Sequence, residues 1–417
     1  MLRDLDLPLS RLQIASIVES ERHRMSIWSG AVRSGKTVSS LVAFLIALAV
    51  APSSGLVIIC GRSLQTIERN ILDPLQDPTL FGPLAAHVAH TRGATVATIL
   101  GRTVHLIGAS DARAEGRLRG LTACLALADE ITLLPEGFFN QLLARLSVPG
   151  ARLLGTTNPD GPAHWLKAKF LNRAADLDLG SWHFTLDDNP SLDPKYVAAL
   201  KAEYVGLWYR RFVLGEWCLA EGVIYDMWDQ ERHVVDILPT MERWLAVGID
   251  HGTKNPFSAI LIGLGQDGCL YAASEWRHDS TMARRQMTDA EYSSAVRGWL
   301  AELGVTPQWI VVDPSAAGFV EQLHRDGLSP AGADNAVMDG IRTVASLLAA
   351  GRLRVHRSCT GLIQEFPGYA WDDTAAEKGE DKPIKLADHS LDALRYGVRT
   401  TEALWRPRIP TRLEVAA

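Results

Sequence analysis

Cysteine is scarce in this sequence, and the few cysteines are not arranged as a scaffold. The chain has 417 residues and 5 cysteines, none of which lies near another at the short spacing of a zinc ligand set. An odd number of scattered cysteines indicates a reducing compartment and argues against a disulfide framework. The five are Cys60, Cys124, Cys218, Cys269 and Cys359.

Long hydrophobic runs and a secretory leader are missing as well. The longest apolar run, LVAFLIALAVA at 41–51, is far shorter than the ~20 residues that span a bilayer. The first ten residues, MLRDLDLPLS, lack the basic-then-apolar order of a signal peptide. We therefore expect a soluble protein without a membrane partner, in which the run at 41–51 is a buried helix.

A strong positive charge is also absent. The net charge is −6, and the acidic excess lies in the second half, because residues 1–220 carry 22 basic and 20 acidic side chains whereas residues 221–417 carry 20 and 28. An acidic half can still act on DNA if its carboxylates bind divalent metals, since the ions reverse the local charge. Charge alone therefore neither indicates nor excludes a nucleic-acid partner.

The length suggests two or three domains.

The sequence does contain a phosphate-binding loop in its full context. The apolar strand MSIWSG at 25–30 leads directly into GAVRSGKT at 30–37, and a helix is expected from Lys36 to about Val50. Strand, G-x-x-x-x-G-K-[ST] and helix together define the P-loop of nucleotide triphosphatases. The pattern predicts a site for ATP with Mg²⁺.

Each residue of this loop has an expected role. The glycines allow backbone N–H groups to face phosphate oxygens at the N-terminus of a helix. Lys36 would reach the β- and γ-phosphates, Thr37 would bind Mg²⁺, and Arg33 would add a further cation. The residues expected to bind the nucleotide here are Gly30, Arg33, Ser34, Gly35, Lys36 and Thr37.

A partner for the loop follows at LALADE, residues 125–130, an apolar strand that ends in two carboxylates. Asp129 would hold Mg²⁺ through water, and Glu130 would orient or deprotonate the attacking water. Upstream, Gln13 is a candidate for reading the adenine edge, although its own sequence context is weak.

Further strands are expected at 55–61, 103–110 and 151–159, so that five strands alternate with helices. This order predicts a mostly parallel sheet covered on both faces. The last of these strands would bring Thr156, Thr157 and Asn158 to the carboxyl edge, where ligands bind. Asn158 is placed to sense the γ-phosphate, and a polar cap at the strand end is a nearly equal reading.

Three arginines lie in the loop SDARAEGRLRG at 110–120, just before the acidic strand. In an oligomeric ATPase, one of Arg113, Arg117 and Arg119 would complete a neighbour's site as a finger. A solvated basic loop is the alternative interpretation, and the sequence does not decide which arginine would act.

The second half has a different pattern. Three apolar strands, of which the last two are joined by a tight turn, are followed by alternating helices and strands, which is the order of the ribonuclease H fold. We expect a P-loop ATPase domain at 1–215, an aromatic-rich linker or hinge at 216–242, and a ribonuclease H-like α/β nuclease domain at 243–417. The strands expected in the last domain are 244–252, 257–265, 269–276, 309–316 and 353–356.

Four carboxylates lie where such a nuclease needs them. Asp250 ends the first of these strands and Asp313 ends the fourth, while Asp388 and Asp392 share one face of a final helix. Together they would hold two Mg²⁺ or Mn²⁺ ions ~4 Å apart and cut DNA by two-metal chemistry. Each acid alone has a structural explanation, such as a strand end or, for Asp388, a helix N-cap. The role of His389 stays open.

Taken together, these motifs resemble those of the large terminase subunit of tailed bacteriophages, a motor and nuclease that packages DNA. The resemblance covers nearly the whole chain. It is carried by GAVRSGKT, LALADE and GTTNP in the first half, by RRFVLGEW at the junction, and by VGIDHGTKNPFSAI, IVVDPSAAGF, VMDGIRTVASLLAAGRL and DHSLDALRY in the second half.

The resemblance implies further roles in the motor. Thr156, Thr157 and Asn158 match the family's coupling motif, which links hydrolysis to DNA movement. Gln13 matches the adenine-contacting position, and an arginine near Arg119 would act on a neighbouring subunit.

The same resemblance assigns the nuclease residues. Asp250, Asp313 and Asp388 match the family's carboxylates, and Asp392 is an accessory acid. Two departures leave details open. Many members place the loop arginine one residue before the position of Arg33, and the third metal ligand is not fixed among Asp388, His389 and Asp392.

The partners and location are likewise implied by the family. The chain would pump double-stranded DNA into a procapsid in the host cytoplasm, as a homo-oligomeric ring on the portal, together with a small terminase subunit. Two rivals are a helicase-like translocase with a non-catalytic second domain and a transposase- or resolvase-type nuclease. The second rival would share the carboxylates but would not require Lys36.

Overall fold

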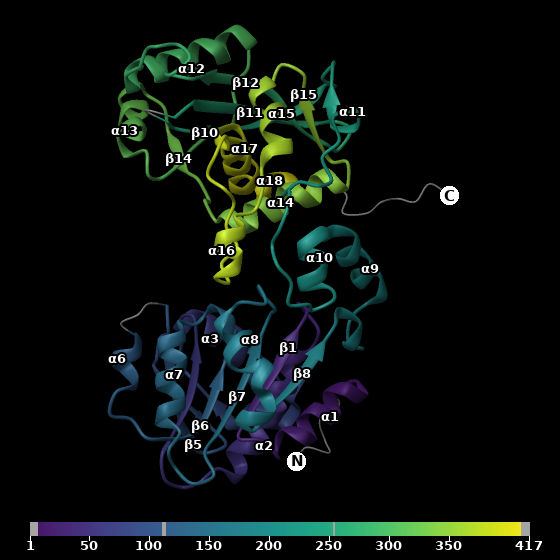
Figure 1. Ribbon diagram of the computed structural model, residues 1–417, viewed down its shortest axis with the longest axis vertical. Coiled ribbons are helices and arrows are strands. Elements are labelled where there is room, and N and C mark those ends of the chain that lie inside the picture. The colour runs from purple at the N-terminus through teal and green to yellow at the C-terminus, as the bar shows by residue number, and fades with distance from the viewer. Residues whose placement is uncertain (1–6, 111–113, 253–254, 410–417) are drawn as a thin grey trace. The chain divides into compact units, whose positions relative to one another are not determined.

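The computed structural model describes residues 7–110, 114–252 and 255–409. The chain divides into two compact units, each built around its own sheet (Figure 1). The first unit consists of Met1–Lys201, Leu207–Ala220 and Thr374–Asp381, and the second of Ala202–Gly206, Glu221–Asp373 and Lys382–Ala417. Both units mix helices with sheets whose strand pairs are mostly parallel.

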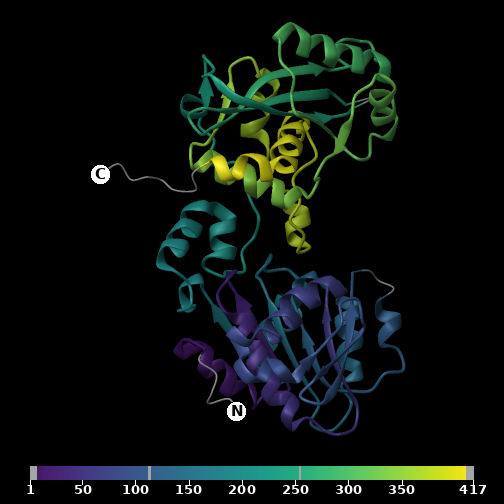
Figure 2. The ribbon, with the colours of Figure 1, turned by 180° about the vertical axis from the view of Figure 1, so that it is seen from behind.

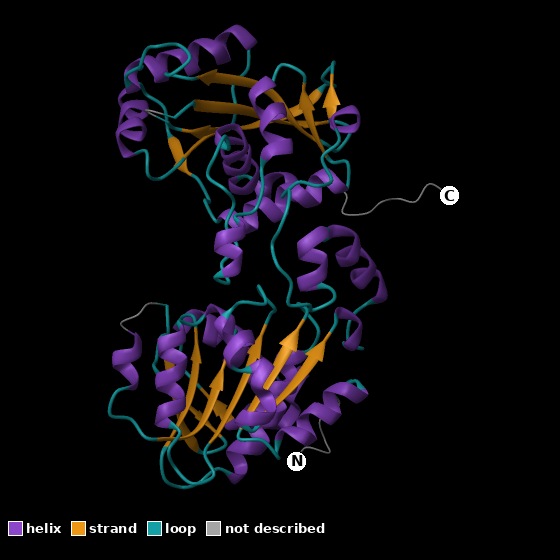
Figure 3. Ribbon diagram, in the orientation of Figure 1, coloured by secondary structure: helices purple, strands orange, loops and turns teal. Residues whose placement is uncertain are grey.

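The first unit contains an eight-stranded sheet in the order β3-β4-β5-β2-β6-β7-β1-β8. The strands from β5 to β8 in this order are parallel (Figure 3). At one edge, β3, β4 and β5 pair in antiparallel fashion. The strands are β1 (Met25–Gly30), β2 (Leu56–Gly61), β3 (Val88–Ala89), β4 (Val96–Ile99), β5 (Arg102–Gly108), β6 (Ala123–Ala128), β7 (Arg152–Thr157) and β8 (Leu179–Phe184).

The five strands predicted from the sequence of this unit are confirmed, and three others were missed. β8 is parallel to β1, and its residues LGSWHF have no apolar run because two of its side chains point to solvent. The short strands β3 and β4 carry too few residues to show a pattern.

Helices cover both faces of this sheet, as the views from the front and from behind show (Figures 1 and 2). On one face, Leu125 and Leu127 of β6 pack with the apolar residues of α2, and on the other face Ala126 and Ala128 pack with α7. This alternation follows the two-residue period of a strand. The longer helices are α1 (Arg11–Ser20), α2 (Lys36–Val50), α7 (Glu136–Arg145) and α9 (Pro194–Glu203).

Short helical segments connect the remaining strands. One of them is a π-helix at Glu68–Leu72, which lies between α3 and α4. The short helices are α3 (Leu64–Ile67), α4 (Asp73–Leu75), α5 (Pro78–Phe81), α6 (Glu115–Leu118), α8 (Trp165–Lys169) and α10 (Gly206–Phe212).

The second unit contains a seven-stranded sheet in the order β14-β13-β10-β11-β12-β15-β9. The strands β10, β11 and β12 are antiparallel, as predicted, and the outer pairs are parallel. The strands are β9 (Val234–Val235), β10 (Met241–Asp250), β11 (Phe257–Gly265), β12 (Leu270–His278), β13 (Trp309–Val312), β14 (Pro330–Gly332) and β15 (Leu353–His356).

The helices α12 and α17 pack against this sheet. The core beside α12 contains Tyr292 and Val296, which contact apolar residues of β10 and β11. α17 lies close to β10 at Gly248, where a Cβ atom would stand 2.0 Å from the backbone oxygen of Ala393. The helices are α11 (Gln230–His233), α12 (Asp289–Leu303), α13 (Ala317–Arg325), α14 (Val337–Ala349), α15 (Thr360–Glu365), α16 (Asp373–Glu377), α17 (His389–Thr400) and α18 (Glu402–Trp405).

The expected hinge at 216–242 is divided between the two units, because its later part is packed structure. Within this segment, residues 221–242 belong to the second unit. Trp228 stacks on Phe366 with ring centroids 3.9 Å apart, and buried Tyr225 stacks on Tyr369 at 5.7 Å. The aromatic side chains of this segment therefore form part of the core of the second unit.

No helix among the described residues is long and apolar enough to cross a membrane. All five cysteines are buried and free.

Candidate functional site

The P-loop connects β1 to α2, and its backbone has the geometry that the glycine pattern predicts. Gly35 has φ +81°, and a Cβ atom there would lie 2.0 Å from Nε2 of Gln13. Arg33 also has a positive φ, of 57°, and its carbonyl accepts a 2.7 Å hydrogen bond from Asn189. The loop thus has tight neighbours on two sides.

Lys36 is buried at the start of α2. Its Nζ donates to Oδ1 of Asn158 at 2.6 Å and to the carbonyl of Ala31 at 3.0 Å. Burial lowers the pKa of Lys36, and the negative charges of Glu130 and Asp129 oppose that shift. The ammonium group is therefore held at the edge of the sheet by oxygen acceptors.

Asp129 directly follows β6, and both of its carboxylate oxygens are oriented by neighbours. Thr156 Oγ1 donates to Oδ1 at 2.9 Å, and Asn70 Nδ2 donates to Oδ2 at 2.9 Å. A carboxylate held in this way keeps further lone pairs for a metal-bound water. Its chemistry suits the Mg²⁺ of a nucleotide, for which Thr37 is the expected second ligand.

Glu130 is turned toward the same edge by an unusual backbone conformation. Its φ and ψ are 51° and 59°, in the left-handed region that non-glycine residues rarely adopt. Its Oε2 accepts a 2.8 Å hydrogen bond from Nδ2 of Asn158. Burial raises the pKa of this carboxyl, while the charge of Lys36 works in the other direction. A raised pKa suits a general base that acts near neutral pH.

Two residues of the predicted tripeptide at the end of β7 contact Lys36, Asp129 and Glu130, and the third contacts Thr132. Thr156 binds Asp129, Thr157 lies 3.1 Å from Thr132 Oγ1, and Asn158 joins Lys36 to Glu130. The structure therefore brings these three residues together with the loop and the acidic strand.

A pocket of about 670 Å³ lies over the P-loop. Besides the loop, Glu130 and Asn158, its lining includes Arg69, Asn70 and Asn189, none of which belongs to a sequence motif. Arg69 and Asn70 belong to the π-helix after β2, a segment without a recognisable motif. Asn189 follows β8, the strand that was missed.

The other residues predicted in the first unit lie as follows. Gln13 is buried in α1, where its Nε2 donates to the carbonyl of Ser34 at 3.3 Å and its Oε1 accepts from the amide of Ser10 at 2.7 Å. Arg117 donates to the carbonyl of Gly108, and Arg119 is exposed. Arg113 lies outside the described residues. The trans role of an arginine in this loop stays a prediction.

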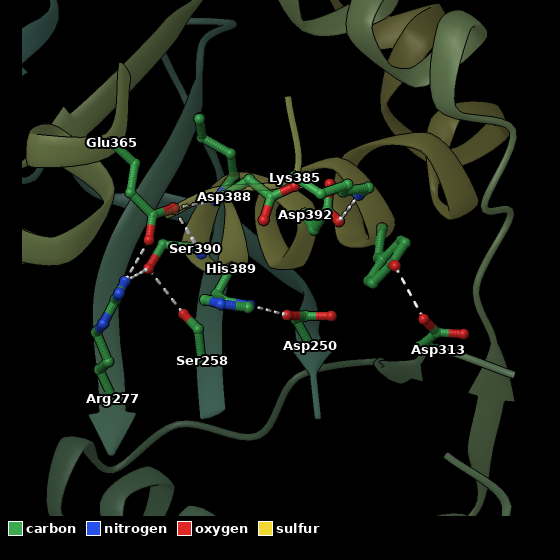
Figure 4. Close-up of polar contacts among 12 residues, drawn as sticks. Asp250, Ser258, Arg277, Asp313, Glu365, Lys385, Asp388, His389, Ser390 and Asp392 are labelled. Atoms are coloured by element: carbon green, nitrogen blue, oxygen red, sulfur yellow. Dashed lines mark hydrogen bonds and ion pairs between the residues drawn. The ribbon is translucent and has the colours of Figure 1, made fainter. Parts of the chain in front are cut away.

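In the second unit, Asp250 and Asp313 lie at the ends of adjacent parallel strands, as predicted, since Ile249 of β10 pairs with Val312 of β13. Oδ2 of Asp250 lies 2.8 Å from Nδ1 of His389, and Oδ2 of Asp313 accepts from the hydroxyl of Tyr396 at 3.0 Å (Figure 4). Burial raises the pKa of Asp250, whereas its hydrogen bond to His389 lowers it.

Asp388 and Asp392 lie at the start of α17, and basic side chains contact both. Nζ of Lys385 is 3.1 Å from Oδ2 of Asp388 and 2.9 Å from Oδ2 of Asp392 (Figure 4). The other oxygen of Asp392 accepts from the buried Arg395 at 2.8 Å. These contacts favour a structural role for Asp392. Its metal-binding role stays a prediction.

The N-cap interpretation of Asp388 is correct in position only, because its side chain makes no capping hydrogen bond. Instead, Glu365 at the end of α15 accepts from the amides of Ser390 and Leu391, at 2.7 and 3.0 Å. Glu275 of β12 in turn accepts from the amide of Gly361 in α15 at 2.8 Å. Two buried carboxylates therefore hold the helix starts, which leaves the Asp388 carboxylate uncommitted to capping.

The described carboxylates of the second unit are of the right chemical type to bind divalent metals, but they are not grouped around one point. Asp250, Asp313 and Asp388 supply the hard oxygen ligands that Mg²⁺ and Mn²⁺ prefer. In the part of the chain that the structure describes, however, no three His, Cys, Asp or Glu side chains are grouped to hold a metal. Lys385 supplies the positive charge beside Asp388 and Asp392.

Comparison with known proteins identifies the family. A family model described as "Terminase large subunit, T4likevirus-type, N-terminal" matches residues 27–231. The solved large terminase from the thermophilic bacteriophage D6E is 34% identical to this chain, with a TM-score of 0.85, and the match covers 94% of this chain and 99% of that one. The chain belongs to the large terminase family.

Further structures of the D6E protein, and a second relative, are also similar to this chain. The D6E large terminase has also been solved in complex with ADP, with a TM-score of 0.83, and in complex with ATP-gamma-S, with a TM-score of 0.81. The large terminase subunit of Escherichia phage T5 is 27% identical over 278 residues, which is 63% of this chain and 61% of the length of the T5 protein.

Proposed function

We propose that this large terminase subunit hydrolyses ATP in its first unit and uses the energy to move double-stranded DNA into a procapsid. The observation that carries the proposal is the bridge that Asn158 forms between Lys36 and Glu130. The complexes of the related D6E protein with ADP and ATP-gamma-S support it.

The contacts among these side chains support the following proposed roles in hydrolysis. Lys36 would stabilise charge on the β- and γ-phosphates, and Thr37 and Asp129 would hold the Mg²⁺ that accompanies the nucleotide. Glu130 takes the proton of the attacking water, which the raised pKa of its carboxyl favours. Asn158 keeps Glu130 and Lys36 at a fixed distance while charge develops between them.

We also propose that the second unit is a ribonuclease H-like nuclease that cuts concatemeric DNA. The order of its central strands and the positions of Asp250 and Asp313 at neighbouring strand ends support this assignment. Asp250, Asp313 and Asp388 would hold two Mg²⁺ or Mn²⁺ ions, which activate water and stabilise the leaving oxygen when bound. Asp392 supports the site through its pairing with Arg395.

The proposed partners follow from the family. The chain would work in the host cytoplasm as a homo-oligomeric ring on the portal of a procapsid, with a small terminase subunit that selects the DNA. In such a ring, Arg119 or a neighbouring arginine would reach the nucleotide of the adjacent subunit.

Separate loss of the two activities tests the proposal. Lys36→Ala should abolish DNA-stimulated ATP hydrolysis and leave cleavage of supercoiled plasmid with Mn²⁺ intact. Asp313→Ala should abolish cleavage and leave hydrolysis intact. If a folded variant of either kind lost both activities, two separable sites would be ruled out.

A helicase-like translocase with a non-catalytic second unit is the alternative, and the pairing of Lys385 with Asp388 and Asp392 favours it. Such a protein would hydrolyse ATP but cut no plasmid with Mg²⁺ or Mn²⁺. Cleavage by the wild type, and not by Asp313→Ala, would exclude this alternative.

A further inference from the structure

The π-helix at Glu68–Leu72 brings two polar residues to the nucleotide pocket. It follows β2, which is the neighbour of β6 in the sheet, so the chain leaves β2 at the same carboxyl edge from which Asp129 projects. Single π-helical turns occur frequently at functional sites. Arg69 and Asn70 from this turn line the pocket together with the P-loop.

The orientation of the π-helix is held by residues on either side of this pair. Glu68 is buried and accepts from the amide of Gly93 at 2.7 Å and lies 3.0 Å from His90 Nε2. Ile71 and Leu72 are fully buried in the core beside α2. Because these flanking residues are anchored, Arg69 and Asn70 are the positions of this turn that face the pocket.

Asn70 connects Arg69 to the acid that is expected to hold Mg²⁺. Its Nδ2 donates to Oδ2 of Asp129 at 2.9 Å, and its Oδ1 accepts from Nε of Arg69 at 3.3 Å. The amide orientation is determined by this pairing, since a carboxylate can only accept and a guanidinium can only donate. Asn70 therefore orients one oxygen of Asp129, as Thr156 orients the other.

The charge of Arg69 is not neutralised by a neighbour. No carboxylate within the described ranges forms an ion pair with it, whereas the nearby Arg92 pairs with Asp73 at 3.0 Å. Arg69, Arg33 and Lys36 line the pocket with Glu130 as the acidic residue beside them. This excess of positive charge suits a nucleoside triphosphate, and a guanidinium can bind two phosphate oxygens at once.

We propose that Arg69 binds the triphosphate from within the same subunit as the P-loop, and that Asn70 is a positioning residue for Asp129. The proposal rests on the proposed ATP hydrolysis and adds residues to that site. Arg69 would stabilise the charge that spreads over the transferred phosphoryl group, and Asn70 would keep Asp129 aligned for its metal-bound water.

For Arg69, the full chain is compared with Arg69→Ala and with the control Arg92→Ala, a solvent-exposed arginine near the same segment. We expect kcat of DNA-stimulated ATP hydrolysis to fall at least about 10²-fold in Arg69→Ala alone. Its affinity for ATP-gamma-S should fall more than its affinity for ADP. A kcat within about twofold of the control would overturn this role. Intact hydrolysis with weakened DNA binding would assign Arg69 to DNA instead.

For Asn70, the Mg²⁺ concentration that gives half-maximal hydrolysis is the informative measurement, because a merely structural role would not change it. We expect Asn70→Ala to raise this concentration about tenfold while its thermal unfolding midpoint stays that of the wild type. An unchanged Mg²⁺ dependence would remove the positioning role.

The same variants test the proposed ATP hydrolysis and the role of Arg69 separately. If the wild type neither hydrolyses ATP nor binds ATP-gamma-S better than Lys36→Ala, the ATPase assignment itself falls. If those two proteins differ as expected and Arg69→Ala equals Arg92→Ala, only the role of Arg69 falls.

Discussion

Nδ2 of Asn158 donates a 2.8 Å hydrogen bond to Oε2 of Glu130. The other side of the same amide accepts from Lys36 at 2.6 Å, which fixes its orientation because an ammonium group can only donate. One short side chain at the end of β7 thus connects Lys36, the proposed phosphate-binding lysine, to Glu130, the proposed general base. A movement of either group must displace the other.

Removing this bridge should slow hydrolysis without preventing nucleotide binding. In Asn158→Ala, Glu130 loses a hydrogen-bond donor and is no longer aligned with the attacking water. We expect kcat of ATP hydrolysis to fall about 10²-fold with little change in KM. The exposed Asn140→Ala on α7 is the matched control. A rise in KM with an unchanged kcat would contradict this prediction.

Gln13 should contribute to nucleotide binding beyond its part in capping α1. Ser10→Ala removes the same cap, since Ser10 Oγ accepts from the amide of Gln13 at 3.2 Å, but it leaves the contact with Ser34 in place. Both Gln13→Ala and Ser10→Ala should lower the free energy of unfolding by about 1 kcal/mol. Only Gln13→Ala should weaken ATP-gamma-S binding, by about tenfold. Equal affinities of the two variants would limit Gln13 to capping.

Asp392 should prove essential for stability. Asp392→Asn would leave the buried guanidinium of Arg395 without its carboxylate, which costs about 3 kcal/mol or more in unfolding free energy. The double variant Asp392→Asn with Arg395→Met removes both charges and should recover much of the loss. A metal ligand without a structural role would instead give a single variant of wild-type stability that cuts DNA poorly.

One partly buried carboxyl, that of Asp160, predicts a pH dependence of stability in the first unit. Burial raises the pKa of Asp160 from 3.8 to about 6, with Arg211 opposing this shift and Asp381 adding to it. Between these two values the folded protein binds the proton more tightly than the unfolded chain, so protonation is stabilising there. The contribution of this group to stability should therefore fall as pH rises from about 4 to about 6 and stay constant above.

Thermal unfolding of the wild type and of Asp160→Asn across this pH range tests the sign. The midpoint of the wild type minus that of the variant should decrease from pH 4 to pH 6. A difference that increases with pH would mean that the ion pair with Arg211, 3.2 Å away, outweighs burial.

Much of the site was predictable because its residues follow strands with an apolar run. β1 and α2 begin and end where the pattern placed them, and Asp250 and Asp313 end neighbouring strands. The rest depends on tertiary contacts that leave no periodic signal. Arg69 lies in a π-helix without a motif, and the pairing of Asp392 with Arg395 looks in sequence like any exposed helical pair of charges.

The left-handed backbone conformation at Glu130 lowers stability at a position that the proposed activity requires. An L-residue in that conformation costs about 1–2 kcal/mol relative to glycine, which adopts it freely. Glu130→Gly should therefore relieve this backbone strain while it removes the proposed base. In a laboratory selection for heat resistance alone, position 130 is where we expect the motor to be inactivated first.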